Sequence, residues 1–185
     1  MRLEESLCRE EEDVAKLFKD KIVLIGMPGS GKTTIGKVIS KELNYNFYDM
    51  DNYIENISGK SVDDLFKVSE DMFRDWESKA CHDLANKKKA IISSGGGVVK
   101  RKSNIDILNK DGLIIFIDRP IENIINDIDS NSRPLLKGNV ERLYELYDER
   151  YELYKEYADI IVRNDSYIRQ TIDEVLNAIK QRIKV

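Results

Sequence analysis

The chain has 185 residues, of which 41% are hydrophobic and 35% are charged. This composition is typical of a globular protein with one domain and a sizeable core, and it excludes a disordered chain. The 30 Lys and Arg residues against 34 Asp and Glu residues give a net charge of −4. We therefore expect neither nucleic acid nor an anionic membrane as a partner, and any anion-binding site must be local.

The sequence also bears on cellular location. No apolar run approaches the length of a membrane span, and the N-terminus is charged, unlike a secretory signal. Cys8 and Cys81 are too few for a disulfide framework and lack the spacing of metal ligands. We expect a cytoplasmic protein with free thiols.

Residues Met1 to Asp20 form a charged segment with one weak apolar face, which is typical of a helix. This segment precedes the main domain, which we expect to span residues 21–185. Three interpretations of the segment stay open: a docked helix, an oligomer contact or a solvated tail.

Strand-like apolar runs alternate with amphipathic stretches along the main domain. Strands are expected at residues 21–26, 45–49, 90–94, 112–118 and 159–162. Helices are expected at residues 32–43, 62–87, 102–110, 121–128, 140–156 and 167–183. This alternation predicts an α/β fold in which helical crossovers join parallel strands. In such a fold, ligands bind at the carboxyl ends of the strands.

The segment Gly26 to Thr33 reads Gly-Met-Pro-Gly-Ser-Gly-Lys-Thr and lies between the first expected strand and helix, so it has the sequence and context of a P-loop. Its glycines let backbone amides approach a polyphosphate, and the following helix adds the positive end of its dipole. Lys32 is suited to the β- and γ-phosphates and the Thr33 hydroxyl to magnesium. The expected nucleotide-binding residues are Gly29, Ser30, Gly31, Lys32, Thr33 and Thr34.

Carboxylates and glycines follow the next two expected strands. Asp49 and Asp51 end the second strand, where they are suited to magnesium or a phosphate acceptor, although Asp51 could instead cap the next helix. Three glycines at 95–97 follow the third strand and indicate either close approach to a ligand or a flexible turn. No aspartate ends this strand, and we expect Ser93 to hold a metal-bound water instead.

Two further patterns lie on expected helices. Arg74 and Glu77 stand three residues apart, for which a surface ion pair is the simplest account. A series of tyrosines at helical spacing surrounds Arg150 and favours core packing over a ligand surface. The series comprises Tyr144, Tyr147, Tyr151 and Tyr154.

Together these residues resemble the shikimate kinase family, from residue 21 to about residue 180. The resemblance is carried by the P-loop, Phe47-Tyr48-Asp49-Met50-Asp51, Phe73-Arg74 with Glu77, Ser94-Gly95-Gly96-Gly97, Arg133-Pro134-Leu135-Leu136, and Arg150 with Leu153-Tyr154 before Ala158-Asp159. It implies a three-layer αβα fold with a five-stranded parallel sheet, like that of nucleoside-monophosphate kinases. It also implies a mobile lid at about residues 129–138, with an ordinary surface turn as the alternative for Arg133-Pro134.

The function implied by the resemblance is transfer of phosphate from ATP to the 3-hydroxyl of shikimate, in aromatic amino acid biosynthesis, by a monomer. The implied catalytic residues are Lys32, Asp51 and the lid residue Arg133, which also contacts ATP. Magnesium is expected at Thr33 and Asp49. Substrate contacts are expected from Asp51, Arg74, Gly95, Gly96, Gly97 and Arg150. The guanidinium groups suit a carboxylate because they can bind it through two parallel hydrogen bonds, and Glu77 is expected to hold Arg74.

One departure from the family concerns adenine. Family members usually carry an arginine several residues before the lid, where it stacks on the base, but this chain has Ile125-Asn126-Asp127-Ile128. Adenine must therefore be held in another way.

Two other functions stay open. A gluconate kinase would share the P-loop and lid, but it has no reason for the acceptor residues. A nucleotide-operated switch or noncatalytic ATP-binding module is the second alternative. Asn109-Lys110-Asp111-Gly112 is the nearest match to the guanine-reading motif of switch GTPases, but its aspartate comes one place early.

Overall fold

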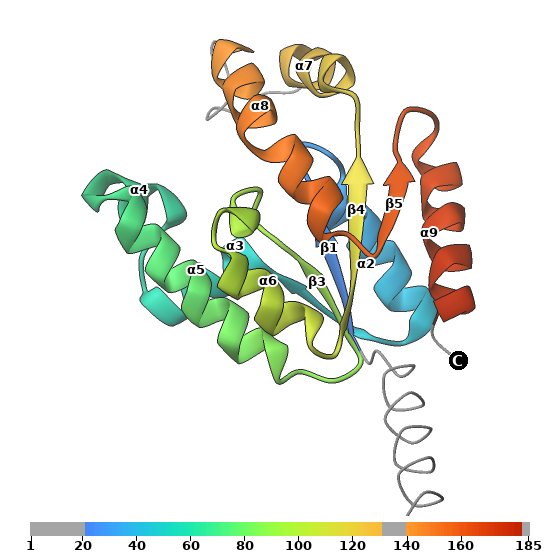
Figure 1. Cartoon of the computed structure of the whole chain (residues 1–185), viewed down its shortest axis with the longest axis horizontal. Coiled ribbons are helices and arrows are strands. Elements are labelled where there is room, and N and C mark those ends of the chain that lie inside the picture. Colours follow the sequence, from blue (N-terminus) through green and yellow to red (C-terminus); the bar gives the residue numbers. More distant parts are fainter. Residues whose placement is uncertain (1–20, 131–139, 183–185) are drawn as a thin grey trace, which may run out of the picture.

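A computed structural model describes residues 21–130 and 140–182 of the chain. Its centre is a five-stranded sheet in the order β2-β3-β1-β4-β5, with every pairing parallel (Figure 1). The strands are β1 (Lys21–Ile25), β2 (Asn46–Asp49), β3 (Ala90–Ser93), β4 (Gly112–Asp118) and β5 (Ile160–Arg163). The predicted parallel α/β sheet is confirmed. The expectations for Met1 to Asp20, for Cys8 and for most of the lid, including Arg133, lie outside the described residues.

Helices cover both faces of the sheet (Figure 1). They are α2 (Lys32–Leu43), α3 (Met50–Ser58), α4 (Val62–Val68), α5 (Glu70–Ala85), α6 (Lys102–Asn109), α7 (Ile121–Ser130), α8 (Val140–Tyr157) and α9 (Ile168–Arg182), with one 3-10 turn, η1 (Val98–Lys100). Residues of α2 and α9 share one apolar cluster with the sheet. Residues of α3, α5, α6 and α8 share the other. The described part of the chain is therefore a three-layer αβα structure.

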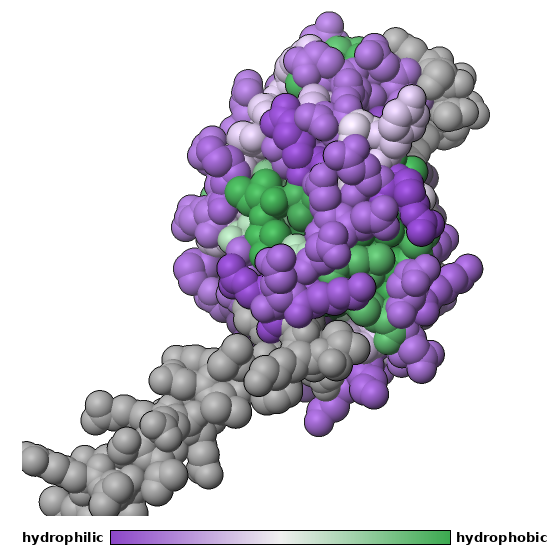
Figure 2. All heavy atoms as spheres, turned by 90° about the vertical axis from the view of Figure 1, so that its right-hand side faces the viewer, coloured by the Kyte–Doolittle hydropathy of each residue, from purple (hydrophilic) through white to green (hydrophobic). Residues whose placement is uncertain are grey.

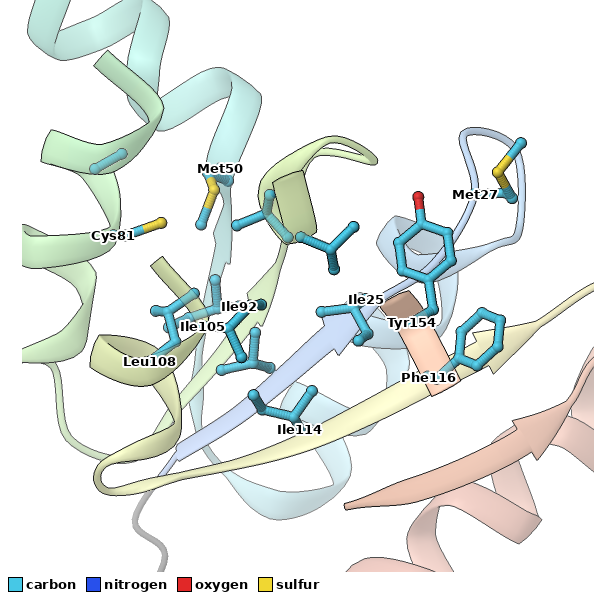
Figure 3. Close-up of a cluster of buried hydrophobic side chains, with 14 of the residues drawn as sticks. Ile25, Met27, Met50, Cys81, Ile92, Ile105, Leu108, Ile114, Phe116 and Tyr154 are labelled. Carbon is cyan, nitrogen blue, oxygen red and sulfur yellow. The ribbon is translucent and has the colours of Figure 1, made fainter. Parts of the chain in front are cut away.

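The central strands are buried on both faces because neighbouring residues point in opposite directions. Leu24 packs toward α2 and α9, whereas Ile25 packs toward the opposite layer. This arrangement explains why β1 and β4 read as continuous apolar runs rather than as alternating ones. On the second layer, Tyr154 of α8 stacks on Phe116 of β4, with ring centroids 5.1 Å apart (Figure 3). Tyr154 is the fully buried member of the tyrosine series, so the core interpretation holds for that end of α8.

The predicted helix at residues 62–87 is wrong in one respect, because it consists of two helices that meet at Ser69. The Ser69 hydroxyl caps α5 by accepting a hydrogen bond from the Met72 amide at 3.0 Å. A capping serine adopts extended backbone geometry, so the chain changes direction there. The sequence analysis also did not predict α3. Asp49, not Asp51, caps this helix, accepting from the Asn52 amide at 3.4 Å.

Two features of the described residues concern contact with a membrane: the character of the helices and the polarity of the surface. Within residues 21–130 and 140–182, no helix combines the length and apolar character that crossing a bilayer requires. Figure 2 shows a largely hydrophilic face with smaller apolar areas on the side that carries β5 and α9. On this side Ile161, in the edge strand β5, is 49% exposed.

The segment after β5 packs against the P-loop through Asn164. Its side-chain amide donates to the Ser30 carbonyl oxygen at 2.9 Å, and its Oδ1 accepts from the Thr171 hydroxyl at 2.9 Å. Its backbone amide donates to the Asp118 carbonyl oxygen at 2.7 Å. Asn164 is buried, so these bonds are shielded from water. One residue thus links the P-loop, through its side chain, to the carboxyl ends of β4 and β5, through its backbone.

We expect Asn164→Ala to lower the free energy of unfolding by about 1–3 kcal/mol, because it leaves buried hydrogen-bonding groups unsatisfied. Urea unfolding followed by circular dichroism measures this loss. Asn177→Ala is the matched control, because Asn177 lies on the exposed face of α9. Equal unfolding midpoints for the two variants would contradict the assignment.

Candidate active site

The P-loop connects β1 to α2 and encloses the ammonium group of Lys32. Lys32 Nζ donates to the carbonyl oxygens of Gly26 and Met27, both at 2.8 Å, and lies 3.4 Å from Ser30 Oγ. The side chain is 7% exposed. A lysine folded across its own loop in this way is held where the phosphates of a nucleotide bind.

Three P-loop glycines adopt backbone angles that other residues rarely adopt. Gly26, Gly29 and Gly31 have φ of 141°, 83° and 98°. Left-handed geometry turns successive amides toward one side of the chain, which forms an anion-binding concavity. Gly31 precedes α2 and provides no side-chain cap, so the first amides of that helix face the same region. Thr34, expected among the nucleotide contacts, lies exposed in the first turn of α2.

Oxygen atoms from three elements meet beside the P-loop. The Thr33 hydroxyl donates to Asp49 Oδ2 at 2.9 Å and lies 3.2 Å from Ser93 Oγ. These side chains come from α2 and from the carboxyl ends of β2 and β3. A carboxylate and two hydroxyls suit Mg²⁺, which prefers oxygen ligands and retains most of its waters. The structure thus brings together Thr33, Asp49 and Ser93, the residues that the sequence analysis associated with magnesium and its water.

Asp51 lies in the first turn of α3 and faces the glycine loop after β3. A Cβ atom built on Gly95 would stand 3.0 Å from Asp51 Oδ1 and 3.2 Å from Glu77 Oε1. The Asp51 side chain keeps solvent access. Nearby protein atoms nevertheless displace part of the water around its carboxylate, and this desolvation raises the pKa of Asp51 above the ordinary value. The negative charge of Asp49 adds to this rise. The positive charges of Lys32 and Arg74 oppose this rise of the pKa.

Arg74 and Glu77 of α5 form a buried ion pair, so the surface interpretation is wrong. Arg74 Nη1 donates to Glu77 Oε2 at 2.7 Å, and the two side chains are 7% and 1% exposed. A Cβ atom on Gly97 would overlap the Arg74 guanidinium, so a side chain at this position would displace that group. Burial raises the pKa of Glu77 although Arg74 lowers it. Glu77 Oε1 has no hydrogen-bond partner among the described residues.

Arg150 of α8 is a further buried cation of this site. Its charge acts on Glu77, as do those of Arg74 and Asp51. Arg150 is 5% exposed. One turn further along α8, the Tyr154 hydroxyl donates to the Gly96 carbonyl oxygen. Burial raises the pKa of Tyr154, and Arg150 acts in the opposite direction.

The glycine loop also contacts the P-loop directly. A Cβ atom on Gly96 would stand 2.8 Å from Pro28 Cδ. The nucleotide cradle and the acceptor residues therefore share one boundary. Asp51 and Arg74 border the glycines at 95–97, and Lys32 lies in the P-loop that Gly96 contacts. Arg150 lies one turn before Tyr154, which bonds to Gly96, whereas Arg133 lies outside the described residues.

Several residues around this site escaped the sequence analysis. Phe66 stacks on Phe73 with centroids 4.3 Å apart, and the Arg74 guanidinium lies 5.9 and 5.1 Å from these rings. Charged side chains also lie beside the arginines: Glu70 pairs with Arg74, and Lys100 pairs with both Glu70 and Glu149. Phe73 was named in the sequence analysis only as part of the Phe73-Arg74 motif, and Phe66 was not named. The contacts of Lys100 had no local signal, because they join residues 30 and 49 positions away.

The segment that lacks the expected adenine-stacking arginine is reached by an arginine from elsewhere. Arg119, between β4 and α7, forms an ion pair with Asp127 of α7 at 2.7 Å. Ile124, on the same helix, would stand 3.0 Å from a Cβ atom on Gly29. Helix α7 thus borders the P-loop, with a guanidinium beside it.

The position of the partial guanine-reading motif argues against a GTPase switch. Asn109 ends α6 and Gly112 begins β4. The motif thus lies at the amino end of a strand whose carboxyl end is near the P-loop. Because all the strands are parallel, these residues are at the opposite edge of the sheet from a bound nucleotide.

Comparison with known proteins gives consistent results. A family model described as "Shikimate kinase" matches residues 28–180. The shikimate kinase of Clostridium beijerinckii is 54% identical over 168 residues, which are 91% of this chain and 99% of that protein.

Solved structures agree. The shikimate kinase from Acinetobacter baumannii in complex with shikimate has a TM-score of 0.80 at 28% identity, covering 90% of this chain and 97% of that chain. A gluconokinase from Sinorhizobium meliloti has a TM-score of 0.60 at 17% identity, covering 89% of this chain and 93% of that chain. At that identity the likeness shows only a shared fold. With its P-loop, its arginine-lined glycine loop and these relatives, the chain belongs to the shikimate kinase family.

Proposed function

We propose that this chain transfers the γ-phosphoryl group of ATP to the 3-hydroxyl of shikimate, giving shikimate 3-phosphate and ADP in the pathway to chorismate. The observation that carries this proposal is that Asp51 and the buried Arg74–Glu77 ion pair border the glycine loop at 95–97, which also contacts Pro28 of the P-loop. Lys32 acts on Asp51 from the P-loop side. A phosphate cradle thus adjoins a site for a small hydroxylated acid.

The chemistry of the acceptor explains the residues around it. Shikimate has a carboxylate at one end of its ring and hydroxyl groups at the other. Arg74 and Arg150 are permanently cationic and can bind the carboxylate through paired hydrogen bonds. Asp51 and the unpartnered Glu77 Oε1 are acceptors suited to hydroxyl groups. The glycines at 95–97 let the ring approach the backbone, since side chains there would meet Asp51, Pro28 or Arg74.

Phosphoryl transfer requires alignment and charge stabilisation more than covalent chemistry. Asp51 orients the attacking hydroxyl and takes its proton, a role favoured by its raised pKa. Lys32 Nζ leaves its loop carbonyls to meet the phosphate oxygens. Thr33 and Asp49 would hold Mg²⁺, directly or through its waters, and the ion would neutralise developing charge on the phosphates.

The lid is part of the proposal. We assign residues 129–138 to a segment that closes over the nucleotide and brings Arg133 to the transferred phosphate. Closure would exclude water and limit ATP hydrolysis. We further propose that the enzyme is a cytoplasmic monomer, as the resemblance to the family implies.

The direct test is ADP release by the purified protein with Mg²⁺ and ATP, measured by a coupled assay. We expect turnover with shikimate and little with gluconate or without an acceptor, because Arg74 and Arg150 match the carboxylate while Asp51 faces the ring hydroxyls. Equal turnover with gluconate would favour the sugar-acid alternative. ATP binding without acceptor-dependent turnover would favour a binding module.

We expect Asp51→Asn to lower kcat about 10²- to 10⁴-fold with a modest change in shikimate KM, because a positioned proton acceptor typically contributes that much. In the unchanged enzyme, kcat/KM should fall as the pH decreases through the pKa of Asp51. That limb should lie above the ordinary value of 3.8, since the pKa is raised. Near-normal turnover by Asp51→Asn would remove the base assignment.

We expect Arg150→Lys to raise the shikimate KM about 10- to 100-fold while leaving the ATP KM within about threefold, because one ammonium group cannot reproduce a two-pronged contact. Steady-state kinetics with each substrate varied in turn measures this split. Arg142→Lys is the control on the same helix, since Arg142 is half-exposed and paired with Glu145. Parallel loss for both substrates in Arg150→Lys would contradict a specific carboxylate contact.

A further inference from the structure

A chain of alternating charges joins the two arginines of the acceptor site. Lys100 Nζ, from η1, lies 2.8 Å from Glu70 Oε1 and 2.9 Å from Glu149 Oε1. Glu70 Oε1 also accepts hydrogen bonds from Arg74, and Glu149 Oε2 lies 3.4 Å from Arg150 Nε. Lys100 is thus linked to each arginine through one carboxylate. The chain runs between α5, η1 and α8, which are distant in sequence.

Stability does not explain this arrangement. The side chain of Lys100 is 29% exposed, and those of Glu70 and Glu149 are 46% and 39% exposed. Ion pairs with this access to water contribute little to folding. The side chains of the two arginines at the ends of this series are each 7% exposed. We therefore ask how the exposed charges of Lys100, Glu70 and Glu149 affect the contacts of the two buried arginines.

Glu70 competes with an acid substrate for Arg74. Its Oε1 accepts from Arg74 Nε at 3.3 Å and from Nη2 at 3.1 Å, while Nη1 donates to Glu77. A carboxylate that used both of its oxygens on Nε and Nη2 would form the strong paired contact that arginine favours. Glu70 stops short of this pairing, because one of its oxygens serves both arginine nitrogens.

Lys100 is the reason that Glu70 stops short. The shortest contact of Glu70 Oε1 is the one to Lys100, and this hydrogen bond is the main cause that lowers the pKa of Glu70 to about 2. Glu149 Oε1 likewise lies closer to Lys100 Nζ than Glu149 Oε2 lies to Arg150 Nε. Arg150 Nε has no hydrogen-bond partner among the described residues, so its contact with Glu149 is an ion pair without a hydrogen bond. Both carboxylates thus face Lys100 more closely than they face the arginines.

We propose that Lys100 is a positioning residue for the acid substrate: it holds Glu70 and Glu149 back from full pairing with Arg74 and Arg150, which leaves guanidinium N–H groups for the substrate carboxylate. This inference rests on the proposed function and deepens it. Lys100 also offsets two negative charges that would otherwise repel an anionic acceptor.

The first test is Lys100→Met. The shikimate KM should rise about 5- to 20-fold, while kcat and the ATP KM stay within about twofold, because the lost contact affects only acceptor binding. Lys102→Met is the matched control, since Lys102 is an exposed lysine two positions away that pairs with Asp106. Lys100→Arg should keep the shikimate KM within about threefold, because it preserves the charge.

The decisive test is the double variant Lys100→Met with Glu70→Gln. Glutamine keeps a hydrogen-bond acceptor but no longer competes as an anion, so the shikimate KM should fall at least about twofold below that of Lys100→Met. The rise that remains is due to Glu149, which the double variant leaves free to pair with Arg150. A merely structural role predicts that the double variant is at least as impaired as the single one, and that outcome would overturn the inference. Unfolding midpoints of all variants separate misfolding from a binding defect.

Two outcomes distinguish this inference from the function on which it rests. Absence of shikimate-dependent turnover in the unchanged protein overturns both. Normal turnover in the unchanged protein, with an unaltered shikimate KM in Lys100→Met, overturns the role of Lys100 alone. If Lys100→Met does not fold, Glu149→Gln in the Lys100→Arg background tests the same competition, and the shikimate KM should then be no higher than in Lys100→Arg.

Discussion

The active site depends on the strand order, because β3 lies between β1 and β2 in an all-parallel sheet. Ser93 is in register with Leu24 of β1 and with Asp49 of β2. The carboxyl ends of these strands therefore lie at one level, and the Thr33 hydroxyl contacts Asp49 and Ser93 although they are 16 and 60 residues away. The P-loop, the oxygen atoms of Thr33, Asp49 and Ser93, and the glycine loop at 95–97 therefore meet without any long loop having to fold over the sheet. The positions of these side chains are set by the hydrogen-bonded pairing of the strand backbones, which is rigid.

The buried charges of the acceptor site are costly for folding. Removing an ion pair such as Arg74–Glu77 from water costs several kcal/mol, and mutual attraction need not recover it. Glu77 Oε1 adds to this cost, because it has no hydrogen-bond partner among the described residues. A site that holds cations desolvated before the substrate arrives has, however, already met part of the cost of binding an anion. The fold thus exchanges stability for a preorganised receptor.

The sequence predicted those parts of the fold that have local patterns. Strands such as Leu113 to Ile117 are continuous apolar runs, which only a sheet covered on both faces requires. The break at Ser69 was missed because the residues on both sides favour helix, so only the capping preference of serine marks it. The burial of Arg74 and Glu77 was misjudged because an i, i+3 pair has the same sequence on a surface and in a core.

Site residues divide in the same way. Asp51, Arg74, the glycines at 95–97 and Arg150 could be proposed from the sequence because each belongs to a short motif that resembles a known family. Asn164 and Lys100 were not found, because their contacts join Ser30, Glu70 and Glu149 across 134, 30 and 49 positions, and only the folded chain brings these residues together.

This division has a physical cause. Groups that touch a ligand must have a particular chemical type at a particular place, which leaves a pattern in the sequence. Groups that orient them need only a charge or an amide within reach, and many positions in a fold can provide one. The arginines therefore mark where an acid can bind, whereas how strongly they bind it depends on the carboxylates beside them and on the lysine that those carboxylates face.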